Sequence, residues 1–401
     1  MFARDLSNAH VAYSTPTFTA SHLSQHRKIR TYPLNMQTFH CRCPKRNRLF
    51  FDSVTCTLCG RMVGYCPELS SMLAFDPDAE AGLWQSGQRG QSGNPTPRWR
   101  QCQNYALHQV CNWMVPESDT NPLCRACRLN DVIPDLSLPI NLEYWRKIER
   151  AKRHALYSIL MLQLPLVSKH EDAARGLLFR FMTDREPNSE FTEPLAGQAP
   201  IFTGHDNGEI TLNLAEADDI ARTRMRIRLG EVYRTLLGHF RHEIGHYYWF
   251  RLIEKMPRRL EKFRQLFGDE TIDYASALQR HYSEGAPADW SASYISPYAS
   301  MHPWEDWAEC WAHYMHMLDT LETARAFHLS LGAPLPSAAL PTVQRDGSTI
   351  GTLLKDWARL AIALNELNRS MGMPDPYPFI LNNTVQMKLK FIHRIVIANN
   401  K

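Results

Sequence analysis

The segment HEIGH, residues 242–246, decides how this 401-residue chain is interpreted. It lies within residues 232–253, VYRTLLGHFRHEIGHYYWFRLI, whose apolar and aromatic side chains are typical of a buried helix. Residues i and i+4 share one face of a helix, so both His242 and His246 can bind a single Zn²⁺ ion. Glu243 then lies beside the metal and can accept a proton from the water bound to it. The pattern predicts a catalytic zinc site.

A catalytic zinc ion needs a third protein ligand and one open position. The extended metzincin pattern would place a glycine and a histidine three and six residues after His246, where Trp249 and Leu252 stand, so that pattern is excluded. A downstream acid is the alternative, and Glu305 and Glu309 supply it from one face of a predicted helix. One of them can bind zinc while the other accepts a hydrogen bond from a ligand imidazole.

The cysteines form a second pattern, because nine of the ten lie between Cys41 and Cys127. In a reducing compartment such a cluster indicates metal ligands rather than disulfides. The cysteines fall into two sets, each ending in a CxxC knuckle, and each set can complete a tetrahedral Cys₄ shell around a structural Zn²⁺ ion. The first set is Cys41, Cys43, Cys56 and Cys59, and the second is Cys102, Cys111, Cys124 and Cys127.

Several nearby residues offer alternatives. In the second set, His108 or Cys66 could replace one cysteine ligand, and both sets could instead be buried thiols without metal. Cys310 stands alone and is expected to behave as a small buried residue. His313 and His316 follow Glu309 at helical spacing, but histidines at such positions are more often packed in a core.

The predicted fold class is α+β, with a small Cys-rich module followed by a mostly α-helical domain that contains a small sheet. Residues 1–37 are polar and lack periodicity, which predicts a flexible leader. Residues 38–137 hold the cysteines and few apolar runs, so metal binding should also fold this module. Residues 138–401 have helical periodicity over most of their length.

Local sequence patterns give four further expectations. Residues 85–98 are rich in Gly, Ser, Gln and Pro and predict an exposed loop. Residues 208–214, GEITLNL, alternate apolar and polar side chains and predict a short strand. Helices are expected over residues 172–182 and over residues 227–253.

Composition excludes several classes of protein. Apolar residues make up 44% and charged residues 21%, which is ordinary for a globular chain, and the net charge is 45 − 41 = +4. This small excess does not favour nucleic acid as a partner. No apolar run reaches the roughly 18–20 residues of a membrane helix, and the first residues lack the apolar stretch of a secretory signal. We therefore expect a cytoplasmic location and no membrane partner; the sequence assigns no oligomeric state.

The two motifs HEIGH (242–246) and YASMHPWEDWAE (298–309) together resemble those of the gluzincin metallopeptidases. The resemblance implies that Glu305 is the third zinc ligand. It also implies that Glu309, four residues on, holds a ligand imidazole by a hydrogen bond. Together with the two histidines this set would hold one catalytic zinc ion, in addition to the two structural ions of the cysteine sets.

The segment before the acid is also similar to the lethal-factor-like branch of these enzymes. In that branch a tyrosine seven residues before the ligand glutamate helps to stabilise the oxyanion, and Tyr298 occupies this position relative to Glu305. Tyr294 and Tyr282 compete for the same role, and an ordinary core aromatic is the alternative for Tyr298.

The chain as a whole resembles the bacterial zinc-binding metallopeptidases that carry an N-terminal zinc-ribbon domain. The resemblance covers residues 38–395 and rests on CRACRLNDVIPD (124–135), HEIGHYYW (242–249) and PWEDWAECWAHY (303–314). It implies a zinc-dependent peptidase acting on a protein or peptide, in which the zinc-bound water is activated by Glu243. A non-catalytic zinc-ribbon adaptor with a degenerate peptidase scaffold is the alternative.

The resemblance also implies where substrate binds. In related folds an edge strand before the zinc-binding helix pairs with an extended peptide, which is a common mode of peptide recognition. It assigns this role to Gly208, Glu209, Ile210 and Thr211, with an ordinary structural strand as the alternative. The Cys-rich module is expected to brace the peptidase or to bind protein.

Overall fold

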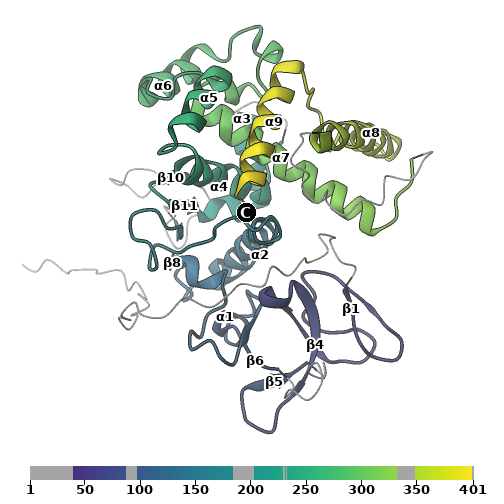
Figure 1. Cartoon of the computed structure of the whole chain (residues 1–401). Coiled ribbons are helices and arrows are strands. Elements are labelled where there is room, and N and C mark those ends of the chain that lie inside the picture. The colour runs from purple at the N-terminus through teal and green to yellow at the C-terminus, as the bar shows by residue number, and fades with distance from the viewer. Residues whose placement is uncertain are drawn as a thin grey trace, which may run out of the picture.

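The computed structural model describes residues 39–86, 97–183, 203–228, 231, 233–331 and 348–399. The predicted leader, residues 1–37, and most of the predicted loop at 85–98 lie outside these ranges. Figure 1 shows the Cys-rich part, in purple and blue, below a group of helices in green and yellow. The mixture of helices with small sheets confirms the α+β class. None of the helices in the described ranges is long and apolar enough to cross a membrane.

The Cys-rich part contains two antiparallel sheets. A two-stranded sheet pairs β1 (Phe39–His40) with β2 (Arg48–Leu49). A five-stranded meander follows in the order β3-β4-β5-β6-β7. Its strands are β3 (Met62–Cys66), β4 (Ser71–Pro77), β5 (Leu83–Gln85), β6 (Arg98–Gln101) and β7 (Met114–Pro116), with the short helix α1 (Gln103–Ala106) between the last two.

A four-stranded sheet lies at the junction with the helical part, in the order β10-β11-β9-β8. Its strands are β8 (Asn130–Val132), β9 (Leu178–Met182), β10 (Gly204–Asp206) and β11 (Glu209–Asn213). β8, β9 and β11 run parallel, whereas β10 is antiparallel to β11. β8 precedes residue 138 and the other three strands follow it, so one sheet spans the predicted domain boundary. The boundary itself stays a prediction.

The helical part is built around α4 (Leu236–Leu252) and α7 (Pro303–Ala326). α2 (Pro139–Met161) packs against α4 from the side of the Cys-rich part, as Figure 1 shows. The other α-helices of this part, within the described ranges, are α3 (Asp219–Arg228), α5 (Pro257–Phe267), α6 (Tyr274–Glu284), α8 (Ser348–Ser370) and α9 (Asn383–Ala398).

The helix expected over residues 172–182 is wrong, and the helix expected over residues 227–253 is wrong at its start. The segment 172–182 forms a turn and then β9, because Phe179 and Phe181 alternate into the core while the strand pairs with β8 and β11. The helix expected over 227–253 begins at Leu236, where the side chain of Thr235 accepts a hydrogen bond from the backbone of Gly238.

Candidate metal centres and active site

Close packing of α4 on α7 creates the first site. Gly245 faces α7 without a side chain, and a Cβ placed there would lie 3.1 Å from the Cα of Ala308 and 3.1 Å from the Trp311 ring. The Trp307 indole N–H donates to the carbonyl oxygen of Gly245 at 2.8 Å. The glycine within the HEIGH segment thus allows the two helices to approach, and this approach brings their polar residues together.

Three potential ligands converge between these helices. One ligand atom from each of His242, His246 and Glu305 lies within 4.8 Å of the others. Nε2 of His242 is 2.9 Å from Oε2 of Glu305 and 3.2 Å from Nε2 of His246. Two imidazole nitrogens and one carboxylate are the donor set of many catalytic zinc sites, so these residues fit zinc.

Glu309 has a different place from Glu305. Its Oε1 accepts a hydrogen bond from Nδ1 of His242 at 2.8 Å, on the far side of the imidazole from the ligand cluster. The structure therefore favours Glu305 as the ligand and Glu309 as the acid that orients His242. Burial favours a higher pKa for Glu309, but its hydrogen bond and charge interaction with His242 outweigh this and lower it.

Glu243 is buried among these groups, with 7% of its surface exposed. Burial raises its pKa, although the nearby His242 and His246 act in the opposite direction. Its Oε2 has no hydrogen-bond partner among the described residues. A buried carboxylate oxygen without a partner is costly, which indicates that water or a reacting group completes the site.

Two tyrosines approach the cluster. The ring of Tyr298 lies 6.1 Å from that of His242. The hydroxyl of Tyr274 donates to Oε1 of Glu305 at 2.9 Å. Of the predicted competitors, Tyr282 is 61% exposed, and Tyr294 packs against the ammonium group of Lys388 at 4.5 Å.

The remaining candidates on α7 pack in the core. Nδ1 of His313 is 2.9 Å from the Tyr377 hydroxyl, and the His316 ring contacts Trp357 and Tyr377. Burial lowers the pKa of His313 to about 4, so this imidazole is neutral. Cys310 is fully buried. None of these side chains belongs to a metal-binding group in the described ranges.

The position predicted for the edge strand needs correction. Gly208, Glu209, Ile210 and Thr211 were expected to form an edge, but Gly208 lies in the turn between β10 and β11. The other three belong to β11, which is paired with β9 on one side and β10 on the other. Among the described residues, the outer strand on this side is β10.

The edge strand β10 lies beside the metal-binding helix. Its residue His205 has a ring 6.1 Å from the ring of His246, with an angle of 13° between the two planes. The backbone N–H of Gly208 donates to Nε2 of His205 at 2.9 Å. Burial lowers the pKa of His205 to about 3. A neutral imidazole on the edge strand therefore lies next to one of the proposed zinc ligands.

The two cysteine sets form two further groups. In each set, the four sulfur atoms lie within 4.8 Å of one another. The Sγ atoms of Cys41 and Cys59 are 3.6 Å apart, and those of Cys111 and Cys124 are 3.7 Å apart. All ten cysteines are free of disulfides. Eight convergent thiols without disulfides fit two tetrahedral Zn²⁺ sites.

The two cysteine sets differ in exposure. Cys59 of the first set is exposed, whereas the four residues of the second set are all buried. The proposed substitutes for the second set are elsewhere: Cys66 is buried on β3, and His108 packs against Trp145 with ring centroids 5.6 Å apart.

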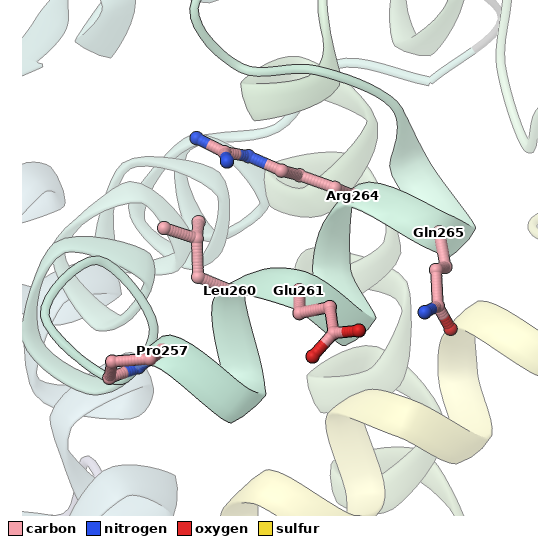
Figure 2. Close-up of a pocket in the computed structure, with 5 residues that line it drawn as sticks. All are labelled: Pro257, Leu260, Glu261, Arg264 and Gln265. Carbon is pink, nitrogen blue, oxygen red and sulfur yellow. The ribbon is translucent and has the colours of Figure 1, made fainter.

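A hollow on the surface shares no lining residue with these three groups. It is lined by residues of α5 alone, as Figure 2 shows: Pro257, Leu260, Glu261, Arg264 and Gln265. None of these residues belongs to a metal-binding group in the described ranges. Arg264 is already paired with Glu270 at 2.9 Å. The hollow therefore has no part in the site.

Tyr274, Ser296 and His205 are the site residues that the sequence did not indicate. Tyr274 is 31 residues from Glu305 and no motif links them. Ser296 donates to Oε2 of Glu309 at 2.6 Å. A usable signal existed only for His205, because Asn207-Gly208 is a strong two-residue hairpin pattern that predicts a strand before it as well as after it.

Comparison with known proteins gives a consistent result. Residues 141–395 match a family model described as "Putative zinc-binding metallo-peptidase", and residues 38–138 match one described as "zinc-ribbon domain". Proteins described as uncharacterized from Mycobacterium tuberculosis and Mycobacterium bovis are each 39% identical over 362 residues, which cover 90% of this chain and 95% of the relative. No solved structure matches this chain.

Proposed function

We propose a function for this chain, which belongs to the zinc-binding metallo-peptidase family and carries a zinc-ribbon domain ahead of the peptidase part. The proposal is that it is a zinc-dependent peptidase of the gluzincin type that hydrolyses peptide bonds in a protein or peptide. The observation that carries it is the convergence of His242, His246 and Glu305 from two helices, with the buried carboxylate of Glu243 beside them.

The proposed roles follow from the contacts. His242, His246 and Glu305 would hold the catalytic zinc ion, which supplies Lewis acidity toward the scissile carbonyl and lowers the pKa of water to about 7. Glu243 accepts the proton of the attacking water and returns it to the leaving amine. Its raised pKa, caused by burial, brings it closer to the range in which it can both accept and release that proton. Glu309 holds His242 in one orientation through the 2.8 Å hydrogen bond.

Two further parts of the site would act on the substrate. Tyr298 is proposed to donate a hydrogen bond to the oxyanion, since its ring lies next to that of His242. The outer strand β10 is proposed to pair with an extended peptide, a role that the sequence interpretation had given to β11. We also propose a cytoplasmic location, because a reducing compartment keeps ten cysteines free of disulfides.

The test compares wild type with Glu243→Gln in metal content and in cleavage of a peptide library. Glu243→Gln should keep its zinc, because Glu243 is not among the proposed ligands, and lose about 10²–10⁴-fold in activity. Glu261→Gln, a matched change on α5 away from the site, should cleave like wild type. Equal, low activity in wild type and Glu243→Gln would refute the peptidase proposal and favour the zinc-ribbon adaptor.

A further inference from the structure

Ser296 occupies a buried position just before the short 3₁₀ helix η5 (Tyr298–Ser300). Its Oγ donates to Oε2 of Glu309 at 2.6 Å and accepts a hydrogen bond from the backbone N–H of Ala299 at 3.1 Å. The other oxygen of Glu309 accepts from Nδ1 of His242 at 2.8 Å. One hydroxyl group therefore connects η5, through a single carboxylate, to an imidazole in the metal cluster.

The hydrogen bonds fix the direction of each donor and acceptor. The Ser296 hydroxyl donates to one oxygen of Glu309, and Nδ1 of His242 faces the other oxygen, so this carboxylate is the acceptor for both groups. Donation from Nδ1 leaves Nε2 of His242 with its lone pair facing the cluster, which is the arrangement a metal ligand requires. Without the Ser296 hydroxyl, Oε2 of Glu309 would lose this partner and the carboxylate could rotate about its last bond.

A neighbouring serine shows that the geometry is particular to Ser296. Ser300 lies on the same turn, is half-buried, and donates to the backbone carbonyl of Pro297 at 2.6 Å. Among the described residues, its hydroxyl makes no hydrogen bond to α7. Ser296 and Ser300 thus have the same chemistry within one turn, and Ser296 is the one connected to Glu309.

We propose that Ser296 is a positioning residue of the catalytic zinc site. It acts through Glu309 to hold the His242 imidazole toward the metal, and through the N–H of Ala299 to hold the turn that carries Tyr298. The metal ligand and the proposed oxyanion donor are therefore set by the same hydroxyl. This inference rests on the proposed function, but it makes a prediction about metal affinity that can be measured without any peptidase assay.

The experiment uses the full chain, with both cysteine sets loaded with zinc, and titrates the catalytic site with zinc against a competing chelator. Ser296→Ala should raise the zinc dissociation constant of this site roughly tenfold, at the lower end of what loss of a supporting hydrogen bond costs. Ser300→Ala should stay within about twofold of wild type. With Co²⁺ at the site, the visible absorption bands should shift in Ser296→Ala and not in Ser300→Ala.

A second pair of variants removes any ambiguity from folding. Ser296→Thr keeps a hydroxyl group. Ser296→Val introduces a side chain of nearly the same shape as threonine but without the hydroxyl group. Ser296→Thr should bind zinc close to wild type, while Ser296→Val should resemble Ser296→Ala. Equal zinc affinity and equal Co²⁺ spectra for the Thr and Val variants would overturn the inference.

The two proposals can fail separately. If wild type cleaves no peptide and Ser296→Val still binds zinc more weakly than Ser296→Thr, then the peptidase proposal falls and the positioning role stands. If wild type is active and the two variants agree in zinc affinity and kcat, then only the positioning role falls.

Discussion

Replacing Gly245 by alanine tests whether the close approach of α4 and α7 creates the metal site. The added Cβ would lie 3.1 Å from the Cα of Ala308, 3.1 Å from Cδ1 and 3.2 Å from Cβ of Trp311. These atoms belong to a packed helix, so α7 must move by a few tenths of an ångström. Alanine itself gains about 1 kcal/mol in helix propensity, and overpacking costs about 1–3 kcal/mol. The expected net loss of unfolding free energy is about 0–2 kcal/mol.

The metal site should respond more clearly than global stability. His242 and His246 lie on α4 and Glu305 on α7, so any separation of the helices increases the distances between the three ligands. We expect the zinc dissociation constant of this site to rise roughly tenfold, as for other losses of ligand support. Chelator competition measures the affinity, and urea unfolding measures the stability.

Gly351→Ala on α8 is the matched control. A Cβ at this position meets no atom within 4 Å, so the substitution should add up to about 1 kcal/mol of stability and leave zinc affinity unchanged. If Gly245→Ala were stabilised to the same extent and bound zinc as tightly as wild type, the helix contact would not determine the geometry of the site.

Two buried groups give further predictions. Burial raises the pKa of Glu322 from 4.5 to about 8, so between these pH values the folded chain holds a proton that the unfolded chain releases. The free energy of unfolding should therefore fall, as pH rises between these values, by up to about 1.4 kcal/mol per pH unit. Urea titrations of Glu322→Gln at several pH values should lack this slope. Lys388→Met leaves the buried Asp306 carboxylate without its ion-pair partner at 2.5 Å, and chemical denaturation should show a loss of about 3–5 kcal/mol in the free energy of unfolding. Adding Asp306→Asn should recover most of this loss. An equal loss in the double variant would contradict this account.

The metal-binding groups were largely accessible from sequence because their spacing is local. His242 and His246 share a helical face by periodicity alone, and the CxxC knuckles place their thiols in neighbouring turns. The partnership of Glu305 with these histidines required the resemblance, since spacing along the chain does not determine how two helices pack. The structure brings the three side chains together, and their assignment as zinc ligands stays a prediction.

The other residues of the candidate site, and two of the strands near it, depend on tertiary contacts that no local sequence pattern encodes. Ser296 and Tyr274 reach the site from the segments before α7, and their sequence neighbours include serines and tyrosines that do not. The segment containing Phe179 was predicted as a helix. It forms a strand because pairing with its neighbouring strands places Phe179 and Phe181 in the core, and a short sequence does not contain that information. The edge strand was missed because the predicted strand began at Gly208, which the structure places in the turn between β10 and β11.

The contacts of α2 favour a bracing role for the Cys-rich part. Arg153 of α2 is buried and donates to the carbonyl oxygen of Val110, next to Cys111 of the second cysteine set. Arg150 pairs with Asp52 of the first half of the module at 2.8 Å. A single hydrophobic core continues from the cysteine residues through α2 to α4 and α7. Removing the Cys-rich part would therefore expose apolar surface on α2, the helix that packs against α4.

Buried polar groups strengthen the same connection. Glu149 and Lys152 of α2 are fully buried and share Asn130, which belongs to β8 and follows the last cysteine of the second set by three residues. Farther along α2, Ser158 donates to Asp319 of α7 at 2.6 Å, and the other oxygen of Asp319 pairs with Arg241 of α4, the residue before the first histidine of HEIGH. Because a buried polar group costs free energy when it is unpaired, each of these hydrogen bonds and ion pairs stabilises the position of the groups that it joins. The two cysteine sets and the proposed catalytic site are thus joined through one helix, so loss of metal from the second cysteine set should alter the position of α4.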